Sequence, residues 1–155
     1  MKLTGSRITV LVLIGVLFLS ISSVYADTAD EYMKKAMEIS LNNTKQDQEY
    51  TFKLNELMNK LDRKEIDSDT YHKDSAKLIR NEIGYLSDAI AEFKKLNPQD
   101  SLIKYHELSL KYLEEMKVAE ECYLIGYVAG WKQHKSKANE YMSDASKELN
   151  GKFKQ

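Results

Sequence analysis

The sequence contains one cysteine and one proline, and both scarcities limit the folds it can adopt. A single cysteine, Cys122, excludes a disulfide within the chain, so the fold must be held by a hydrophobic core. The scarcity of proline leaves long stretches rich in Lys, Glu, Leu, Met and Ala without a helix breaker. No segment alternates apolar and polar residues with the period of a strand. The composition therefore favours an all-helical protein.

The chain also lacks a strong excess of charge of either sign. Its formal net charge is −1, and loss of residues 1–26 would remove two basic residues, leaving 21 basic against 24 acidic, or −3. No basic excess is present to attract nucleic acid. Because acids and bases are interspersed, they are typical of solvated helix faces.

Sequence patterns that support catalysis are missing too. We find no glycine-rich phosphate loop and no nucleophile elbow. The acids stand in helical, lysine-matched stretches such as Glu114-Glu115 and Glu120-Glu121, and we interpret them as solvent-facing. We therefore expect a protein that is not an enzyme.

The three histidines, His72, His106 and His134, are too widely spaced to share a metal ion. If the chain turns back near Pro98, position 98 − n lies opposite 98 + n, and His72 is level with residue 124. His106 then lies roughly 27 Å from that level and His134 roughly 15 Å, at 1.5 Å per residue. No Glu-x-x-His pair is present either. We expect no metal and no cofactor.

A haem-binding bundle is the alternative to a chain without a cofactor. Met33 or Met37 could meet His134 if the first and last helices were neighbours. Because no Cys-x-x-Cys-His motif occurs, such a haem would be bound non-covalently. Methionines that fill a helical core explain the same residues without a haem.

The only long apolar run lies at the N-terminus. Residues 1–26 have a basic start, an apolar run from Ile8 to Ile21 and the small-x-small sequence Val24-Tyr25-Ala26. This order predicts a secretory signal peptide. The run would be roughly 21 Å long as a helix, which is short for a bilayer of about 30 Å, although an uncleaved anchor is the alternative. In both cases residues 27–155 are expected outside the cytoplasm, in the periplasm or the extracellular space.

In the rest of the chain, apolar residues recur every three or four positions through three segments. We predict helices over about 28–64, 68–96 and 101–149. The second carries the clearest coiled-coil-like repeat, formed by Ile79, Ile83, Leu86, Ile90 and Phe93. A polar stretch, 42–48, interrupts the first helix. Because it contains no glycine or proline, we expect the helix to continue through it, and the alternative is a break into two shorter helices.

Turn residues mark the boundaries between these segments. The Asp67-Ser68-Asp69-Thr70 cluster predicts an N-cap, and the short connection around Pro98 forces an antiparallel hairpin. A bend at Gly126–Gly130 would divide the last segment, and Asn150-Gly151 is a natural helix stop. The predicted fold is an all-α antiparallel bundle of three long helices, or four if the bend occurs. It forms one domain over residues 27–155.

The richest apolar segment of this bundle is the best candidate site. It is a patch or pocket formed by Tyr123, Gly126, Tyr127, Gly130 and Trp131. We interpret it as a tight crossing of helices with Trp131 buried, and the alternative is an exposed patch for a partner.

Cys122 lies beside this patch in the sequence. It is expected to be a small buried residue, and the alternative is an intermolecular disulfide between two copies. With no residues suited to chemistry, we expect an exported helical protein that acts through protein–protein interaction or self-association. The second hypothesis is a small-molecule or haem-binding bundle with a pocket near Tyr123–Trp131. Membrane contact is expected only through an uncleaved N-terminal segment.

Overall fold

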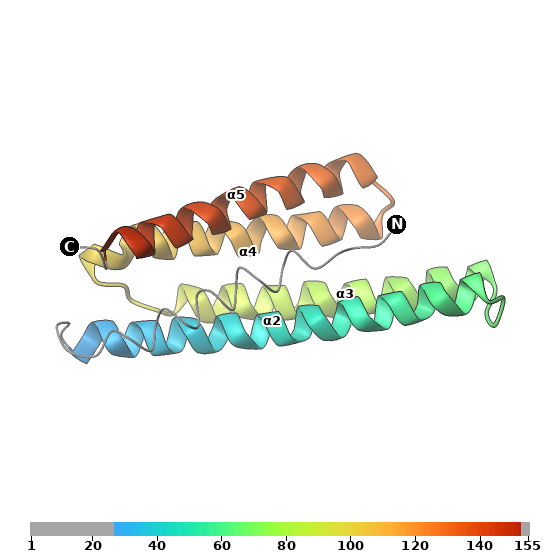
Figure 1. Ribbon diagram of the computed structural model, residues 1–155, viewed down its shortest axis with the longest axis horizontal. Coiled ribbons are helices and arrows are strands. Elements are labelled where there is room, and N and C mark those ends of the chain that lie inside the picture. Colours follow the sequence, from blue (N-terminus) through green and yellow to red (C-terminus); the bar gives the residue numbers. More distant parts are fainter. Residues whose placement is uncertain (1–26, 153–155) are drawn as a thin grey trace.

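The computed structural model describes residues 27–152, and the expected signal peptide lies outside them. Within this range the chain is helical without strands and forms four helices packed against each other (Figure 1). The elements, in chain order, are α2 (Asp27–Asp62), α3 (Ser68–Lys94), the 3-10 turn η2 (Asp100–Leu102), α4 (Ile103–Leu124) and α5 (Val128–Lys152). Consecutive helices run antiparallel. The predicted helical bundle is confirmed, and its third long segment is two helices.

Helix α2 continues through its polar middle, as predicted. Its 36 residues make a rod of roughly 54 Å. Just before and within the polar stretch, the hydroxyls of Ser40 and Thr44 donate to the carbonyls of Ala36 and Ser40, each at 2.8 Å. Both side chains thus bond within α2 itself, an arrangement that is compatible with a continuous helix.

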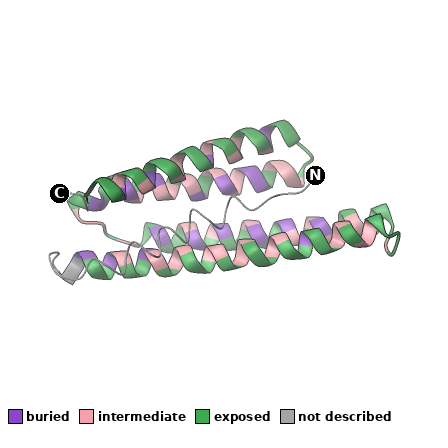
Figure 2. Ribbon diagram, in the orientation of Figure 1, coloured by how far each residue is buried: buried purple, intermediate pink, exposed green. Residues whose placement is uncertain are grey.

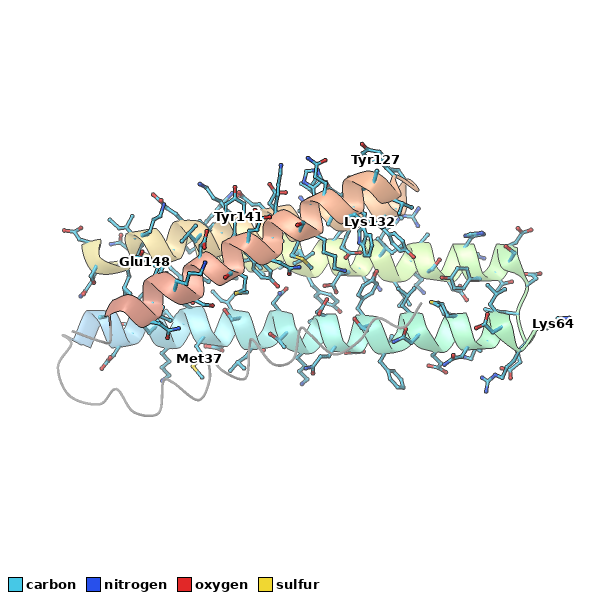
Figure 3. The ribbon with its side chains drawn as sticks, turned by 45° about the horizontal axis from the view of Figure 1, so that its top comes forward. Met37, Lys64, Tyr127, Lys132, Tyr141 and Glu148 are labelled. Atoms are coloured by element: carbon cyan, nitrogen blue, oxygen red, sulfur yellow. The ribbon has the colours of Figure 1, made fainter. Side chains whose placement is uncertain are left out.

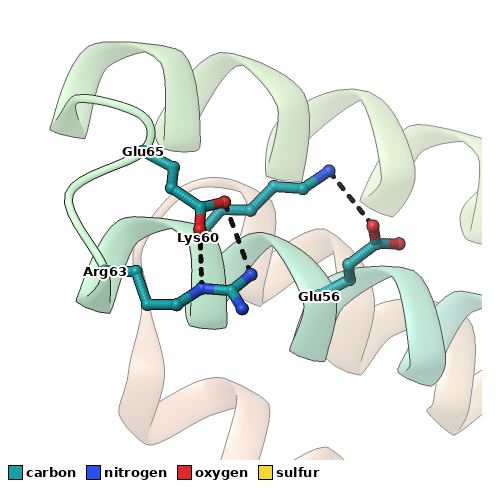
Figure 4. A network of polar contacts seen from close by, with 4 residues as sticks. All are labelled: Glu56, Lys60, Arg63 and Glu65. Atoms are coloured by element: carbon teal, nitrogen blue, oxygen red, sulfur yellow. Dashed lines mark hydrogen bonds and ion pairs between the residues drawn. The ribbon is translucent and has the colours of Figure 1, made fainter.

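The turn from α2 to α3 is built around Lys64, which has a φ of 58°. The N–H of Lys64 donates to the carbonyl of Leu61, and the next N–H donates to the carbonyl of Lys60, each at 2.9 Å. These two bonds form a Schellman motif, in which glycine usually occupies the left-handed position. Figure 4 shows Arg63 paired with Glu65 across the turn, at 2.9 Å from Nε. It also shows Lys60 paired with Glu56 one helical turn earlier.

Helix α3 begins at the predicted cap. The Asp67 carboxylate accepts a hydrogen bond from the N–H of Thr70 at 2.7 Å. Hydrogen bonding from Thr70 holds the pKa of Asp67 below its usual value. Of the predicted repeat, Ile79, Leu86 and Phe93 are buried. The apolar periodicity of α3 thus identified its core face.

The register between α3 and α4 differs from the symmetric hairpin that we expected. Symmetry about Pro98 places Lys94 opposite residue 102, but its ammonium lies 2.9 Å from the carboxylate of Glu114, about three turns farther along α4. The reason is the connection, because residues 96–99 are not helical and carry the chain past the end of α3 (Figure 1). The heights along the bundle that the symmetric hairpin predicted for His106 and His134 relative to His72 are therefore shifted as well.

The core lies between the α2–α3 hairpin and the α4–α5 hairpin (Figure 2). Its members include Tyr32, Leu86, Phe93, Tyr105, Leu108, Leu113, Met116, Ala138, Ala145 and Leu149. Small residues on α5 allow it to lie close against α4. Helix α5 continues past the predicted stop at Asn150-Gly151 to Lys152. No helix within residues 27–152 combines the length and the apolar character needed to cross a bilayer.

Candidate interaction surface

A glycine in the left-handed conformation closes the turn between α4 and α5. Gly126 has a φ of 76°. Its N–H donates to the carbonyl of Tyr123 at 3.0 Å, and the N–H of Tyr127 donates to the carbonyl of Cys122 at 2.8 Å. This Schellman motif satisfies two of the last free carbonyls of α4. The backbone of the turn is therefore fixed by hydrogen bonds.

Gly130 allows a close approach beside this turn. A Cβ placed there would lie 2.3 Å from Cδ1 of Tyr127 and 2.9 Å from Sγ of Cys122. Gly130 is buried beneath the Tyr127 ring, whereas Gly126 is exposed with no atom near its missing Cβ, so the close contact involves Gly130 alone. Cys122 is half-buried with a free thiol. Its intermolecular disulfide stays a prediction.

The rest of the turn is open to solvent. The exposed fraction is 77% for Ile125, 55% for Tyr127 and 49% for Val128. Trp131 is half-buried, so the interpretation of a buried tryptophan is wrong. Its ring packs on Tyr123 with the centroids 5.6 Å apart. We define Ile125, Tyr127, Val128 and Trp131 as the turn patch.

The structure thus brings the five predicted patch residues together at one turn, but it divides their roles. Gly126 and Gly130 shape the backbone, and Tyr123 supports Trp131 from α4. The sequence interpretation missed Ile125 and Val128. Both flank the Gly126-Tyr127 turn, and an apolar residue in a helical connection is the signal that could have identified them.

Lysines border the turn patch on α5. The first ten residues of that helix contain Lys132, Lys135 and Lys137 and no acid. The ammonium of Lys135 lies over the Trp131 ring, 4.4 Å from its centroid, within the range of a cation–π interaction. Figure 3 shows Lys132 and Tyr127 at the same end of α5. The patch is apolar and its border on α5 is basic, whereas the exposed Glu121 precedes it on α4.

A second group of polar residues lies inside the bundle. Glu82 of α3 and Glu120 of α4 are each only 2% exposed. Tyr50 of α2 donates a hydrogen bond to Oε2 of Glu120 at 3.1 Å. Burial, the charge of Glu120 and that hydrogen bond together raise the pKa of Tyr50 above its usual value, with Tyr123 and Glu82 contributing less. The phenol is therefore a stable donor that ties α2 to α4.

This group corrects the interpretation of the acids. Glu120 faces the interior, whereas its neighbour Glu121 is exposed and lies 3.7 Å from Lys117. Helical spacing is the signal that could have separated them. Glu120 stands four positions after buried Met116, and Glu82 stands three positions after buried Ile79.

The histidines occupy three separate environments. His106 packs against Phe93, and its Nδ1 lies 3.1 Å from the hydroxyl of Tyr32. Burial lowers the pKa of His106. His134 lies 2.6 Å from the carboxylate of Glu115, and His72 is exposed. In the part of the chain that the structure describes, no three His, Cys, Asp or Glu side chains are placed to hold a metal ion.

The methionines proposed as haem ligands do not meet His134. Met33 and Met37 line a cavity together with Met142 and Leu149, which belong to the C-terminal half of α5. His134 belongs to the N-terminal half of the same helix and contacts Glu115 of α4. The geometry therefore does not form the predicted methionine–histidine pair.

No protein family, curated protein or solved structure matches this chain.

Proposed function

We propose that this chain is an exported, non-enzymatic binding protein that contacts a protein partner through the turn patch. The observation that carries the proposal is the exposure of Ile125, Tyr127 and Val128 side by side on a turn fixed by backbone hydrogen bonds. A turn that served only to connect two helices would favour polar residues. The N-terminal sequence supports export, because residues 1–26 have the three regions of a signal peptide.

The shape and size of the patch indicate what kind of partner surface fits it. The turn is convex and lies at one end of the α4–α5 hairpin (Figure 1). Its three most exposed side chains offer on the order of 300 Å² of apolar area, whereas a stable flat interface buries about 800 Å² on each partner. A concave partner site that encloses the turn would add the flanks of α4 and α5 to the contact. We therefore propose insertion of the turn into an apolar recess.

The free energy available from this patch indicates a reversible contact. Full burial of roughly 300 Å² contributes at most about 8 kcal/mol at 25 cal/mol per Å². Association costs at least about 4 kcal/mol in lost translation and rotation. The apolar contact alone therefore supports a transient complex, and the lysine border would have to add contacts for a stable one.

The charge around the patch indicates the border of the partner site. Lys132 is exposed beside the patch, and the first ten residues of α5 contain no acid. An acidic border on the partner would complement these lysines and increase the association rate at low ionic strength. The proposed partner is a protein with an apolar recess bordered by acidic residues.

Site-specific photo-crosslinking in the organism that encodes the protein tests this proposal. A photoreactive phenylalanine analogue replaces Tyr127 in the patch or, as the matched control, Tyr85, which is 45% exposed on α3. We expect a protein adduct from position 127 only, and we expect Ile125→Lys in the same chain to abolish it. N-terminal sequencing of the exported form should begin at Asp27.

Other products would contradict the proposal. Equal adducts from positions 127 and 85 would show non-specific contact. A lipid adduct would assign the patch to a membrane surface. An adduct of twice the chain mass would show self-association in place of a separate partner. Retention of the whole chain in the cytoplasm would refute export.

A further inference from the structure

A tyrosine and a histidine join α2 to α4 at the end of the bundle where α2 begins. The hydroxyl of Tyr32, on α2, lies 3.1 Å from Nδ1 of His106, on α4. Phe93 of α3 packs against the imidazole, with the ring centroids 5.2 Å apart. Tyr32 is only 4% exposed, whereas His106 is half-buried, so protons from the solvent reach the imidazole. Three helices therefore meet at one side chain that can change its charge near neutral pH.

The burial of Tyr32 indicates which of the two groups donates. A buried phenol needs an acceptor for its hydrogen, because an unpaired buried O–H is costly. In the part of the chain that the structure describes, Tyr32 is paired with Nδ1 of His106. A neutral imidazole accepts at Nδ1 only when its own hydrogen is on Nε2. Protonation adds a hydrogen to Nδ1, so that the two groups then face each other as donors.

Tyr32 is also the main anchor of the first part of α2. Between residues 29 and 53, the other buried side chains of this helix are those of Ala29 and Ala36, which bury little area. Close helix packing joins α2 to α3, α3 to α4 and α4 to α5, whereas α2 approaches α4 and α5 only loosely. A cavity of about 60 Å³, lined by Met33 and Phe93 among others, lies beside the anchor. Side chains around such a space lack part of their dispersion contacts.

We propose that Tyr32 and His106 form an acid-sensitive latch, which holds the first third of α2 against α4 at neutral pH and releases it on acidification. Burial lowers the pKa of His106, so the closed latch binds a proton less readily than an open one. In the open arrangement the hydrated imidazole has its ordinary pKa of about 6.5. Protonation therefore favours opening, and the closed form loses stability as pH falls below about 6.5. The latch is separate from the turn patch, which lies where α5 begins.

Few other charges influence the latch. Among residues 27–152, Glu107 of α4 is the one charged group whose field acts on His106, and it opposes the larger effect of burial on the pKa. The titratable group that α2 presents is Tyr32, and α3 presents the uncharged ring of Phe93. No charge within the described part of α5 acts on the imidazole. The protonation of His106 itself therefore sets the pH at which the latch opens.

Histidine NMR and amide hydrogen exchange of the exported chain between pH 7.5 and 5.5 test the proposal. Nitrogen-15 spectra should show Nδ1 of His106 without a hydrogen at pH 7.5, and His106 should titrate below about pH 6.5. Over the same range, the protection factors of the amides of residues 32–37 should fall by about twofold to tenfold. Those of residues 54–61, in the second half of α2, should stay constant.

A substitution that cannot titrate identifies the responsible group. His106→Gln keeps an acceptor for the Tyr32 hydroxyl, so the protection of residues 32–37 should no longer depend on pH. His72→Gln, at an exposed position of α3, is the matched control and should keep the response. A hydrogen on Nδ1 of His106 at pH 7.5 would overturn the proposal, as would a response that persists in His106→Gln. An equal loss of protection in both halves of α2 would overturn it as well, and that comparison needs only the unsubstituted chain.

Discussion

Two glycines show how backbone conformation alone decides the role of a residue. Gly84 lies in the middle of α3, and Gly126 closes the turn after α4 with a φ of 76°. A Cβ would meet no atom within 4 Å at either position. Packing therefore does not distinguish the two sites. The left-handed conformation is costly for a residue with a Cβ, whereas the helical one favours it.

We expect opposite effects from the same substitution at these positions. Gly84→Ala should stabilise the protein by about 0.5–1 kcal/mol, because alanine loses less conformational entropy in a helix. Gly126→Ala should destabilise it by about 1 kcal/mol, because the left-handed conformation is strained. Urea denaturation followed by circular dichroism measures both. A stability change of the same sign in both variants would contradict the backbone argument.

The sequence predicted the residues of the candidate patch, but it did not predict that Glu82 and Glu120 are buried. Aromatic and glycine residues close together in the sequence identified the turn, because local spacing brings them together whatever the tertiary fold. The burial of Glu82 and Glu120 depends on which helix covers each face. That information is not contained in the local sequence. For Glu120, Lys117 stands three positions earlier, a spacing that is equally consistent with a solvent-exposed ion pair.

At the scale of elements, periodicity and capping residues predicted the helices closely. The predicted segments 28–64 and 68–96 correspond to α2 (Asp27–Asp62) and α3 (Ser68–Lys94). The division between α4 and α5 remained ambiguous, because a glycine tolerated inside a helix and a glycine at a C-cap give the same sequence pattern. The axial shift between α3 and α4 was not predictable, since it depends on the extended path of residues 96–99.

The turn after α2 contains a strained residue, Lys64, and a substitution by glycine should relieve that strain. Lys64 adopts the left-handed conformation that a Schellman motif requires, with a φ of 58°. We expect Lys64→Gly to raise the free energy of unfolding by about 0.5–1 kcal/mol, because glycine adopts this conformation without a Cβ penalty. Lys60→Gly, inside the last turn of the same helix, is the matched control and should lower it by about 1 kcal/mol. Thermal and urea unfolding measure both changes. A loss of stability in Lys64→Gly would show that contacts of the lysine side chain stabilise the fold by more than its left-handed backbone conformation destabilises it.

At the scale of the whole molecule, buried polar groups join helices that apolar packing alone would leave free to rotate. Tyr50 bonds to Glu120 between α2 and α4, and Tyr32 bonds to His106 between the same two helices. A rotation of α2 about its axis would break both contacts and leave buried polar atoms without partners, which costs about 1–3 kcal/mol each. The tyrosines therefore fix the relative orientation of the two hairpins.

These buried phenols make the stability of the bundle sensitive to alkaline pH. Burial raises the pKa of Tyr32, Tyr50 and Tyr105 above the value of about 10 in an unfolded chain. Above pH 10 the unfolded chain releases these protons while the folded chain retains them, so stability falls as pH rises. The slope should reach at most about 1.4 kcal/mol per pH unit for each tyrosine.

Urea denaturation between pH 9 and about 11.5, with tyrosine ionisation followed by ultraviolet absorbance, measures this dependence. Tyr32→Phe should reduce the slope, since the variant has one buried hydroxyl fewer to protect from ionisation. A free energy of unfolding that stays constant across this range would show that water reaches the three hydroxyls. The contacts of Tyr50 with Glu120 and of Tyr32 with His106 could then not fix the two hairpins against each other.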